Sequence, residues 1–291
     1  MPQVAGARAD RGLRPSAIAI DPMIQRVTSR QNPRLREAAT LIASARDRRK
    51  AGKCVLEGEH IVAAYAARYG PPETLIVTED ALLRPGARAL ADTHSGRTLV
   101  VAAALFDELA TLPSGIGMLA VVPTPKPGVI VPADFCLLLD DVQDPGNVGS
   151  MLRSAAAAGV GQVLLSKHCA FAWSPKVLRA GQGAHFYVDL HEDVDLAAWA
   201  RDFREAGGAV VTMVATGGTD LYDTPFAPHM ALAIGNEGAG ISAALAAQAT
   251  RRVTIPMPGG VESLNAAAAA AVCLFECVRR RRSRSPGVAA N

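Results

Sequence analysis

The sequence predicts an α/β protein in two parts, with a parallel sheet in the larger C-terminal part. Short apolar segments alternate with helix-like segments along most of the chain, which is typical of α/β folds. A proline-rich stretch over residues 123–132 separates the earlier segments from the later ones and is typical of a linker. We therefore expect a smaller α/β domain at residues 21–123, a linker at 124–131 and a larger domain at 132–282.

The elements expected in the first domain follow one another in a mixed order. Residues 35–49 have the pattern of a basic helix, and residues 59–68 that of a second helix. Strand-like apolar runs and further helix-like runs fill the remainder: strands at 53–58, 73–79, 97–102 and 115–123, and helices at 81–93 and 103–112.

The larger domain is expected to begin with a strand buried on both faces, because residues 135–142 are a continuous apolar run. A loop and helix up to Gly159 and a strand at 162–166 complete a βαβ unit. The pattern then continues with a helix at 196–207, a strand at 209–216, a strand, glycine loop and helix within 230–249, and a last strand at 251–257.

Positive charge is concentrated at the front of the chain. Residues 8–53 contain twelve Lys or Arg and four acidic residues, whereas residues 129–291 contain thirteen basic and fifteen acidic ones. A basic front on a near-neutral body suggests a polyanionic partner, with nucleic acid as the first candidate. A solvated arginine-rich helix face would give the same count, so both interpretations stay open.

The sequence gives no indication of a membrane-spanning, secreted or metal-binding protein. No run of about 18 apolar residues predicts a membrane span. Residues 1–20 lack a secretory hydrophobic region, so we expect a flexible tail there, with a transit peptide as the alternative, and a second tail at 283–291. The six His and five Cys residues form no metal-ligand pattern and no CxxC pair, which favours reduced thiols in a cytoplasmic protein.

Two polar segments lie at strand-to-helix junctions. The first, DDVQDPGNVGSMLRSAAAAG, places Asn147 after a proline-glycine turn and Arg153 on the helix that follows, near the strand edge where open α/β sheets bind ligands. Taken singly, a helix cap for Asn147 and a surface ion pair for Arg153 are the favoured interpretations. The second, AIGNEGAGIS, lacks the glycine spacing of a dinucleotide fingerprint, and its Glu237 is either a loop anchor or a carboxylate facing a cation.

A third segment, IPMPGGVESLNAAAAAAV at residues 255–272, joins an irregular loop rich in proline and glycine to an alanine-rich helix. Its prolines and glycines hold a loop whose amides and carbonyls are not consumed by regular structure. The alanines from Ala266 to Ala271 predict a helix against which other backbone packs closely. Ser263 and Asn265 stand at the helix start, but no G-x-S-x-G surrounds Ser263, so a hydrolase elbow is unsupported.

In their order and spacing, the three segments resemble the motifs of the SpoU-type (TrmH-like) branch of the SPOUT RNA methyltransferases, the α/β-knot superfamily. The resemblance covers residues 136–277, and residues 21–123 are similar, less specifically, to the family's smaller substrate-recognition domain. It implies a trefoil-knotted, Rossmann-like C-terminal domain, S-adenosylmethionine as cofactor and a homodimer. It also implies methylation of a ribose 2′-hydroxyl in ribosomal or, second, transfer RNA, with no DNA or membrane partner.

The resemblance further implies roles for individual residues, by their positions in the three motifs. The polar catalytic surroundings would comprise Asn147, Arg153, Glu237, Ser263 and Asn265. The cofactor pocket would be lined by Gly235, Ile255, Met257, Gly259 and Leu264. We expect the basic front to supply RNA affinity through Arg46, Arg48, Arg49 and Lys50. One departure is Ala267, at a position near which the family often has a serine.

The dimer is expected to form through the last helix. The small side chains of Ala266 to Ala271 let another helix come near, and Leu274, Phe275 and Val278 continue as an apolar stripe at helical spacing. Packing within the same chain would use the same surface, and the resemblance favours the dimer.

The main alternative of another class is an RNA-binding or ribosome-docking protein that keeps the knot fold and the cofactor pocket without catalysis. The presence of Asn147, Arg153, Glu237 and Asn265 together argues against it, because a docking module would not require the set. A nicotinamide-dependent oxidoreductase is a distant third interpretation, since its fingerprint is absent. For the methyltransferase, we expect Arg153 to pair with an RNA phosphate and stabilise charge on the reacting oxygen, because a guanidinium resists deprotonation.

Overall fold

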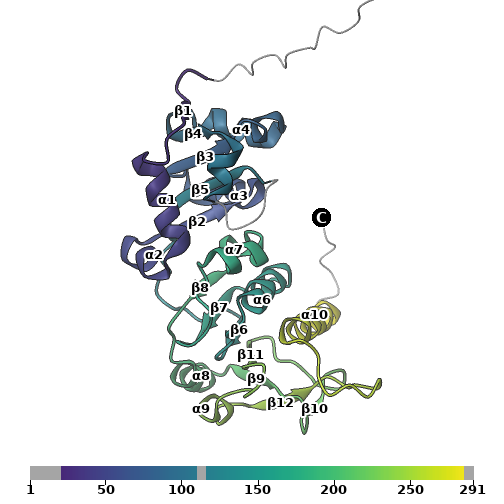
Figure 1. Ribbon diagram of the computed structural model, residues 1–291. Coiled ribbons are helices and arrows are strands. Elements are labelled where there is room, and N and C mark those ends of the chain that lie inside the picture. The colour runs from purple at the N-terminus through teal and green to yellow at the C-terminus, as the bar shows by residue number, and fades with distance from the viewer. Residues whose placement is uncertain (1–20, 110–115, 285–291) are drawn as a thin grey trace, which may run out of the picture.

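The structure is a computed structural model that describes residues 21–109 and 116–284. These residues form two lobes stacked along the long axis of the molecule (Figure 1). The first lobe contains a five-stranded sheet and the second a seven-stranded sheet, so the predicted α/β class is confirmed. The tail expected at 1–20 and most of that expected at 283–291 lie outside the described residues. The trefoil knot stays a prediction.

The first lobe is a mixed sheet with helices on both faces. Its elements are β1 (Gln25–Val27), α1 (Pro33–Ala43), α2 (Ala45–Ala51), β2 (Lys53–Glu57), α3 (Glu59–Tyr69), β3 (Thr74–Thr78), η1 (Ala81–Leu83), α4 (Pro85–Thr93), η2 (Ser95–Arg97), β4 (Thr98–Val101), α5 (Ala103–Asp107) and β5 (Met118–Pro123). The strand order is β1-β4-β3-β5-β2, with β5 antiparallel to both of its neighbours. Buried residues of α1 and α5 pack on one face, and those of α3 and α4 on the other.

The basic helix predicted over residues 35–49 is two helices, which corrects the prediction. Ser44 leaves the helical conformation, with φ −125° and ψ 115°, and its hydroxyl accepts a hydrogen bond of 3.1 Å from the N–H of Asp47. The side chain of Ser44 therefore caps the start of α2. Strand β1, of three residues, was not predicted either.

The second lobe contains a sheet in which every strand pair is parallel. Its order is β10-β12-β9-β11-β6-β7-β8. All five residues of β6 are buried, in agreement with the continuous apolar run. The elements are β6 (Phe135–Leu139), α6 (Pro145–Ala157), β7 (Gln162–Leu165), α7 (Pro175–Gly181), η3 (Ala184–Phe186), β8 (Asp189–His191), α8 (Leu196–Glu205), β9 (Ala209–Met213), β10 (Thr219–Asp220), β11 (Met230–Ile234), α9 (Ala243–Ala246), β12 (Arg251–Thr254) and α10 (Ala266–Arg284).

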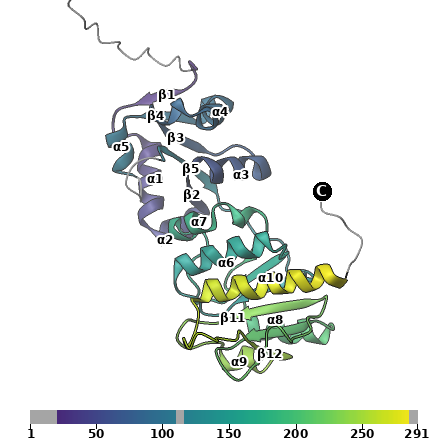
Figure 2. The same cartoon turned by 90° about the vertical axis from the view of Figure 1, so that its right-hand side faces the viewer.

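Helices cover both faces of the second sheet, with α6 and α10 side by side on one of them (Figure 2). Leu137 and Leu139 of β6 belong to the core that includes α6 and α10. Cys136 and Leu138 of the same strand face the other way, into the core formed with α8 and α9. This alternation follows from the pleat of a strand, which sends successive side chains to opposite faces.

The last helix, α10, divides its apolar residues between the core and the surface. Ala270 and Leu274 are fully buried, whereas Ala268 and Phe275 are exposed. The sequence predicted Leu274, Phe275 and Val278 as one stripe, for a partner or for packing within the chain, and Leu274 packs inside its own chain. Only the part of the helix surface that contains Ala268, Phe275 and Val278 remains for an interface.

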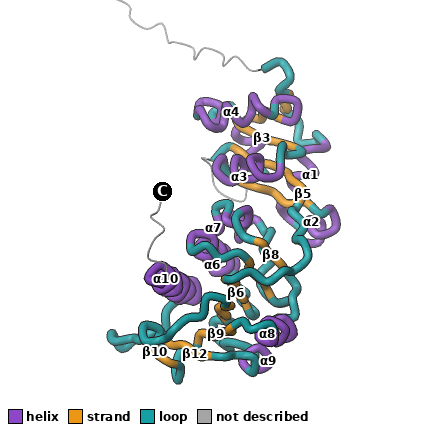
Figure 3. The backbone as a smooth tube through the Cα atoms, turned by 180° about the vertical axis from the view of Figure 1, so that it is seen from behind, coloured by secondary structure: helices purple, strands orange, loops and turns teal. Residues whose placement is uncertain are grey.

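The two lobes meet where α7 packs against β2. Figure 3 shows α7 on the side of the second lobe that faces the first. The ring of Phe186 lies 5.6 Å from that of Tyr65 on α3, in an edge-to-face arrangement that favours aromatic pairs. The guanidinium of Arg49 on α2 lies 4.6 Å from the centre of the Phe171 ring, a cation–π contact between the lobes. Aromatic packing therefore joins the basic front of the chain to the second lobe.

Helices α6 and α7 approach each other closely at Gly149. A Cβ atom at this position would lie 2.4 Å from the Cβ of Ala180, 2.6 Å from the carbonyl oxygen of Val177 and 2.9 Å from the backbone nitrogen of Gly181. Two of these three atoms belong to the backbone, so a side chain fits only if one helix moves. Gly149 therefore fixes the distance between α6 and the helix that joins the lobes.

We expect Gly149→Ala to destabilise the protein by about 1–3 kcal/mol, the usual cost of overpacking a well-packed core. Urea unfolding of the variant and the wild type measures the change. Gly128→Ala is the matched control, because a Cβ there meets no heavy atom within 4 Å, and its stability should stay within about 0.5 kcal/mol of wild type. Equal stability of the two variants would contradict the close approach of α6 and α7.

Candidate functional site

The structure brings the three polar segments together at the carboxyl edge of the second sheet. β6 and β11 are neighbours, so the loops that follow Leu139 and Ile234 leave the sheet side by side. β12 ends on the same edge because the strands are parallel, and the loop after Thr254 leads into α10, which packs against α6. This edge is where open α/β sheets place their ligands.

Asn147 links the other two segments through both ends of its amide. Its Nδ2 donates a hydrogen bond of 2.7 Å to Oε1 of Glu237, 90 residues later in the chain. Its Oδ1 accepts a hydrogen bond of 2.9 Å from Nδ2 of Asn265, 118 residues later. The three side chains thus form a continuous chain of hydrogen bonds that ends in a carboxylate.

Hydrogen bonds at the N-termini of α6 and α10 also hold the two asparagines in position. The N–H of Asn147 donates a hydrogen bond of 2.7 Å to the carboxylate of Asp144, which caps α6. The Oδ1 of Asn265 accepts hydrogen bonds from the N–H groups of Ala267 and Ala268, at 2.9 and 3.2 Å, at the start of α10. The cap suggested for Asn147 is thus made by Asp144 and the one at α10 by Asn265, which leaves the Asn147 amide free for its neighbours.

The glycine loop after β11 is held by contacts within itself. A Cβ at residue 235 would lie 2.3 Å from the carbonyl carbon and oxygen of Gly240 and 2.4 Å from the nitrogen of Ile241. Asn236 accepts hydrogen bonds of 2.9 Å from the N–H groups of Gly238 and Ala239. Gly235 is therefore required by the loop's own backbone, so a larger residue there would deform the loop that presents Glu237.

Two aspartates and Asn236 hold the loops in place and were missed by the sequence analysis. Asp140, buried after β6, accepts a hydrogen bond of 2.8 Å from the N–H of Ser242 beyond the glycine loop. Asp141 adopts a left-handed backbone with φ 58°, and its carbonyl accepts from Nδ2 of Asn236 at 2.9 Å. The signal was present as two acidic residues directly after a buried strand and an Asn among glycines.

The third loop leaves most of its predicted site residues open to solvent. Ile255 is buried and Met257 half-buried, whereas Gly259, Ser263 and Leu264 are exposed. Gly260 has a φ of 77°, which a glycine adopts without strain. Within the described residues, Ser263 makes no side-chain hydrogen bond, so its hydroxyl is available to a ligand.

Arg153 lies six residues after Asn147 on α6, on the exposed side of the helix. In the part of the chain that the structure describes, its guanidinium makes no hydrogen bond and no ion pair, so the surface ion pair considered from the sequence is absent. A guanidinium keeps its charge at all physiological pH values and binds phosphates through two parallel N–H groups. Arg153 is therefore a free cation on the helix that carries Asn147.

The structure corrects one member of the predicted RNA-binding set. Arg48 is only 6% exposed, and its Nη1 donates hydrogen bonds to the carbonyls of Leu41 and Ile42 at the end of α1. Burial lowers the pKa of this guanidinium. Arg46, Arg49 and Lys50 are exposed, although Arg49 also contacts Phe171. Arg48 therefore ties α2 to α1 and does not belong to a binding surface.

The described part of the chain offers no reactive cysteine, no metal site and no membrane-spanning helix. All five cysteines are free thiols, and burial raises the pKa of Cys54 to about 12 and that of Cys136 to about 11, so neither is a nucleophile at neutral pH. Between residues 21–109 and 116–284, no three His, Cys, Asp or Glu side chains gather as a metal site. No helix in the same ranges is long and apolar enough to cross a bilayer.

Comparisons with known proteins agree with this geometry. The model of the SpoU rRNA Methylase family matches residues 134–275, which contain all three loops. The 23S rRNA (uridine(2479)-2′-O)-methyltransferase of Streptomyces viridochromogenes is 31% identical over 90% of this chain and 94% of its own length. The 23S rRNA (guanosine(2553)-2′-O)-methyltransferase RlmP of Bacillus subtilis is 29% identical over 87% of this chain and 98% of its own.

A solved structure extends the likeness to both lobes. The SpoU methyltransferase AviRb from Streptomyces viridochromogenes, in complex with AdoMet, superposes with a TM-score of 0.76 and 32% identity, covering 87% of this chain and 99% of that one. Sequence, fold and the meeting of the three loops thus lead to one assignment. The chain belongs to the SpoU rRNA methylase family.

Proposed function

We propose that the chain is an S-adenosylmethionine-dependent RNA methyltransferase that methylates a ribose 2′-hydroxyl in ribosomal RNA, with transfer RNA as the second substrate class. The observation that carries the proposal is the hydrogen-bond chain from Asn265 through Asn147 to Glu237, which joins one polar residue from each of the three segments. The relatives named as 23S rRNA 2′-O-methyltransferases support the choice of substrate and of reaction.

The third loop has the room and the surface to hold the cofactor. A Cβ at Gly259 or Gly260 meets no heavy atom within 4 Å, so space beside the loop is open, and Leu264 offers an exposed apolar side chain. We infer that S-adenosylmethionine is held between the glycine loop and this third loop, as supported by the AdoMet complex of the related AviRb. Its proposed contacts are Gly235, Ile255, Met257, Gly259 and Leu264. When bound, the cofactor supplies an activated methyl group.

The polar residues of the site are proposed to have two roles, which are to position the reactants and to stabilise charge. Asn147, Asn265 and Glu237 hold the three loops in one arrangement, and a fixed arrangement of reactants supplies several of the roughly 7–11 kcal/mol that proximity offers. Arg153 binds a phosphate of the RNA and stabilises the negative charge that develops on the 2′-oxygen, because its guanidinium does not act as a base. Ser263 offers its free hydroxyl at the same edge.

The first lobe is proposed to recognise the RNA and to hold it through the exposed cations of α2, Arg46, Arg49 and Lys50. A reduced cytoplasmic setting suits both the ribosomal substrate and the free thiols. A ribosome-docking protein without catalysis, the alternative considered from the sequence, has no need for the linked Asn147, Glu237 and Asn265. Transfer of a methyl group from S-adenosylmethionine to RNA separates the two functions.

We also propose a homodimer formed through the exposed face of α10. Ala268 and Phe275 are seven residues apart, two turns of the helix, so they lie on one face. Phe275 is 49% exposed and lines a shallow groove with Val278, Arg279, Arg282 and Ser283. An exposed phenylalanine beside small alanines is typical of a surface that a partner helix covers.

We expect Arg153→Ala to lower methyl transfer by about 10²–10³-fold, the usual loss when one charge-stabilising donor is removed. Nucleoside mass spectrometry of 23S rRNA incubated with S-adenosylmethionine and the protein measures a 2′-O-methylated nucleoside, and calorimetry measures cofactor affinity, which should not change. Arg201→Ala, an exposed arginine on α8 across the sheet, is the control with full activity. A base-methylated product would overturn the proposed reaction, and loss of cofactor affinity in Arg153→Ala would place that residue in the cofactor pocket.

The double variant Arg46→Gln and Lys50→Gln should bind RNA more weakly and with a flatter salt dependence. Each phosphate that the variant no longer binds should reduce the slope of log affinity against log salt by about 0.7–0.9. The pair Arg201→Gln and Arg204→Gln on α8 keeps the same net charge and serves as the control. Identical slopes for the two double variants would show that Arg46 and Lys50 do not bind RNA phosphates, and α2 would then be a solvated helix face.

Ala268→Glu should convert the dimer to a folded monomer, because it places a charge in the proposed interface without entering the core. Light scattering reports the oligomeric state, and Ala67→Glu, at an exposed position of α3, is the matched control. The fully buried Ala270 would be a poor choice, since a charge there would unfold the chain. A wild-type protein that is monomeric at micromolar concentration would refute the dimer.

A further inference from the structure

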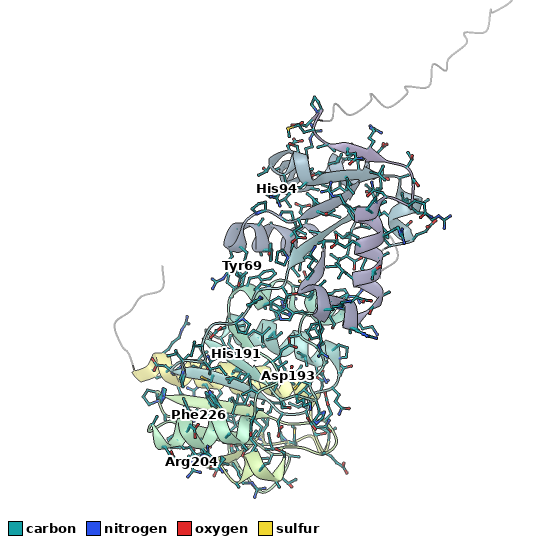
Figure 4. The ribbon with its side chains drawn as sticks, turned by 90° about the vertical axis from the view of Figure 1, so that its left-hand side faces the viewer. Tyr69, His94, His191, Asp193, Arg204 and Phe226 are labelled. Carbon is teal, nitrogen blue, oxygen red and sulfur yellow. The ribbon has the colours of Figure 1, made fainter. Side chains whose placement is uncertain are left out.

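Two exposed tyrosines lie at the junction of the lobes. Tyr187 directly follows η3 and is 72% exposed, and Tyr69 at the end of α3 is 44% exposed. Figure 4 shows Tyr69 at the lower edge of the first lobe, next to the second. The buried Phe186 connects them, because it precedes Tyr187 in the chain and its ring lies 5.8 Å from that of Tyr69.

Packing of the junction does not explain this exposure. Tyr65, Trp173 and Phe186 are buried there and supply the apolar contact between the lobes. The ring of Tyr187 makes no aromatic or cation–π contact with any residue in the described part of the chain. The Tyr69 ring contacts Tyr65 and Phe186 and still leaves 44% of the residue exposed, so both exposed tyrosines offer ring surface to another molecule.

The surroundings of the tyrosines favour an anionic partner. Arg68 is exposed, and its Nε donates a hydrogen bond of 3.3 Å to the hydroxyl of Tyr69, with the guanidinium 5.7 Å from the ring centre. Within residues 21–109 and 116–284, Arg68 makes no ion pair. Asp189, two residues after Tyr187, is already engaged by Gln162 at 3.1 Å and His191 at 2.8 Å. Arg68 therefore places a positive charge without an ion-pair partner against the exposed ring of Tyr69.

The tyrosines are also connected to the candidate site by packing. The short helix η3, which ends next to Tyr187, packs against both α6 and α3. α6 carries Asn147 and Arg153, and α3 carries Arg68 and Tyr69. The segment that ends at Tyr187 therefore packs directly on the helix that carries Asn147 and Arg153.

We propose that Tyr187 and Tyr69 stack on unpaired bases of the RNA substrate while Arg68 contacts an adjacent phosphate. The inference rests on the proposed function and deepens it, because it defines the substrate as a single-stranded or locally opened segment. Bases within a regular duplex are stacked on each other and offer no face to a side chain, whereas splayed bases stack readily on aromatic rings.

The test compares Tyr187→Leu and Tyr69→Leu with wild type on two probes. One probe is a fluorescein-labelled single-stranded RNA oligonucleotide, and the other is the duplex it forms with its complement. Stacking on an aromatic side chain is worth about 1–3 kcal/mol per base, so each Leu variant should bind the single strand about 5- to 150-fold more weakly. Binding to the duplex should not change, and the Phe variants should retain wild-type affinity because they keep the ring.

Salt dependence separates stacking from charge. The Leu variants should keep the wild-type slope of affinity against salt, whereas Arg68→Gln should flatten it by about 0.7, the effect of releasing one phosphate of a single strand. Tyr222→Leu is the matched control. Tyr222 is 50% exposed but follows β10, at the opposite edge of the sheet from β8, which follows Tyr187.

Four results would overturn the inference. Leu variants that bind the single strand as wild type does would remove the stacking role, and an equal loss on the duplex would indicate a shape contact instead. A change of oligomeric state in the Leu variants would assign the surface to a second copy of the chain. If the wild type neither binds RNA nor produces a 2′-O-methylated nucleoside, the proposed function fails together with this inference. If the wild type methylates rRNA and the Leu variants bind normally, only the stacking surface fails.

Discussion

The amide of Asn147 is the point on which the candidate site depends. It donates to Glu237 and accepts from Asn265, so a single side chain holds two loops that have no other side-chain hydrogen bond to α6 among the described residues. Its own position is determined by the core, because α6 packs on the sheet, on α10 and, at Gly149, almost backbone to backbone on α7. Tight packing on one side of α6 thus fixes the geometry of polar groups on the other.

The parts that the sequence predicted well are those set by local patterns. The continuous apolar run of β6, the βαβ unit and the polar segments at strand ends follow from periodicity and turn residues, and the resemblance to a family followed from their order. The break at Ser44 could not be predicted, because that serine is compatible with a helix and ends it only by capping the next one. Arg48 carries the same charge as Arg46, and only the free carbonyls of α1 decide that it is buried.

Contacts between residues that are distant in the sequence were the other feature that the sequence did not predict. A bond between Asn147 and Asn265 leaves no trace in the pattern around either residue, so the pattern alone favoured a helix cap for Asn147, and only the resemblance placed the two residues in one site. Gly235 was expected to make room for a cofactor, and the structure gives a nearer reason in the backbone of Gly240 and Ile241. A glycine between a strand and a loop indicates a close approach, and the identity of what approaches comes only from the fold.

The order of the segments along the chain has a consequence for how the protein is made. Ribosomes synthesise Asn147 and Glu237 well before Asn265, and α10, which packs on α6, comes last of all the described elements. During translation, β6 to β11 can assemble while the final link is still missing. A nascent chain should therefore stay inert toward the ribosome that is producing it until residue 265 has emerged. Premature stop codons before that point would leave a sheet with its loops unjoined.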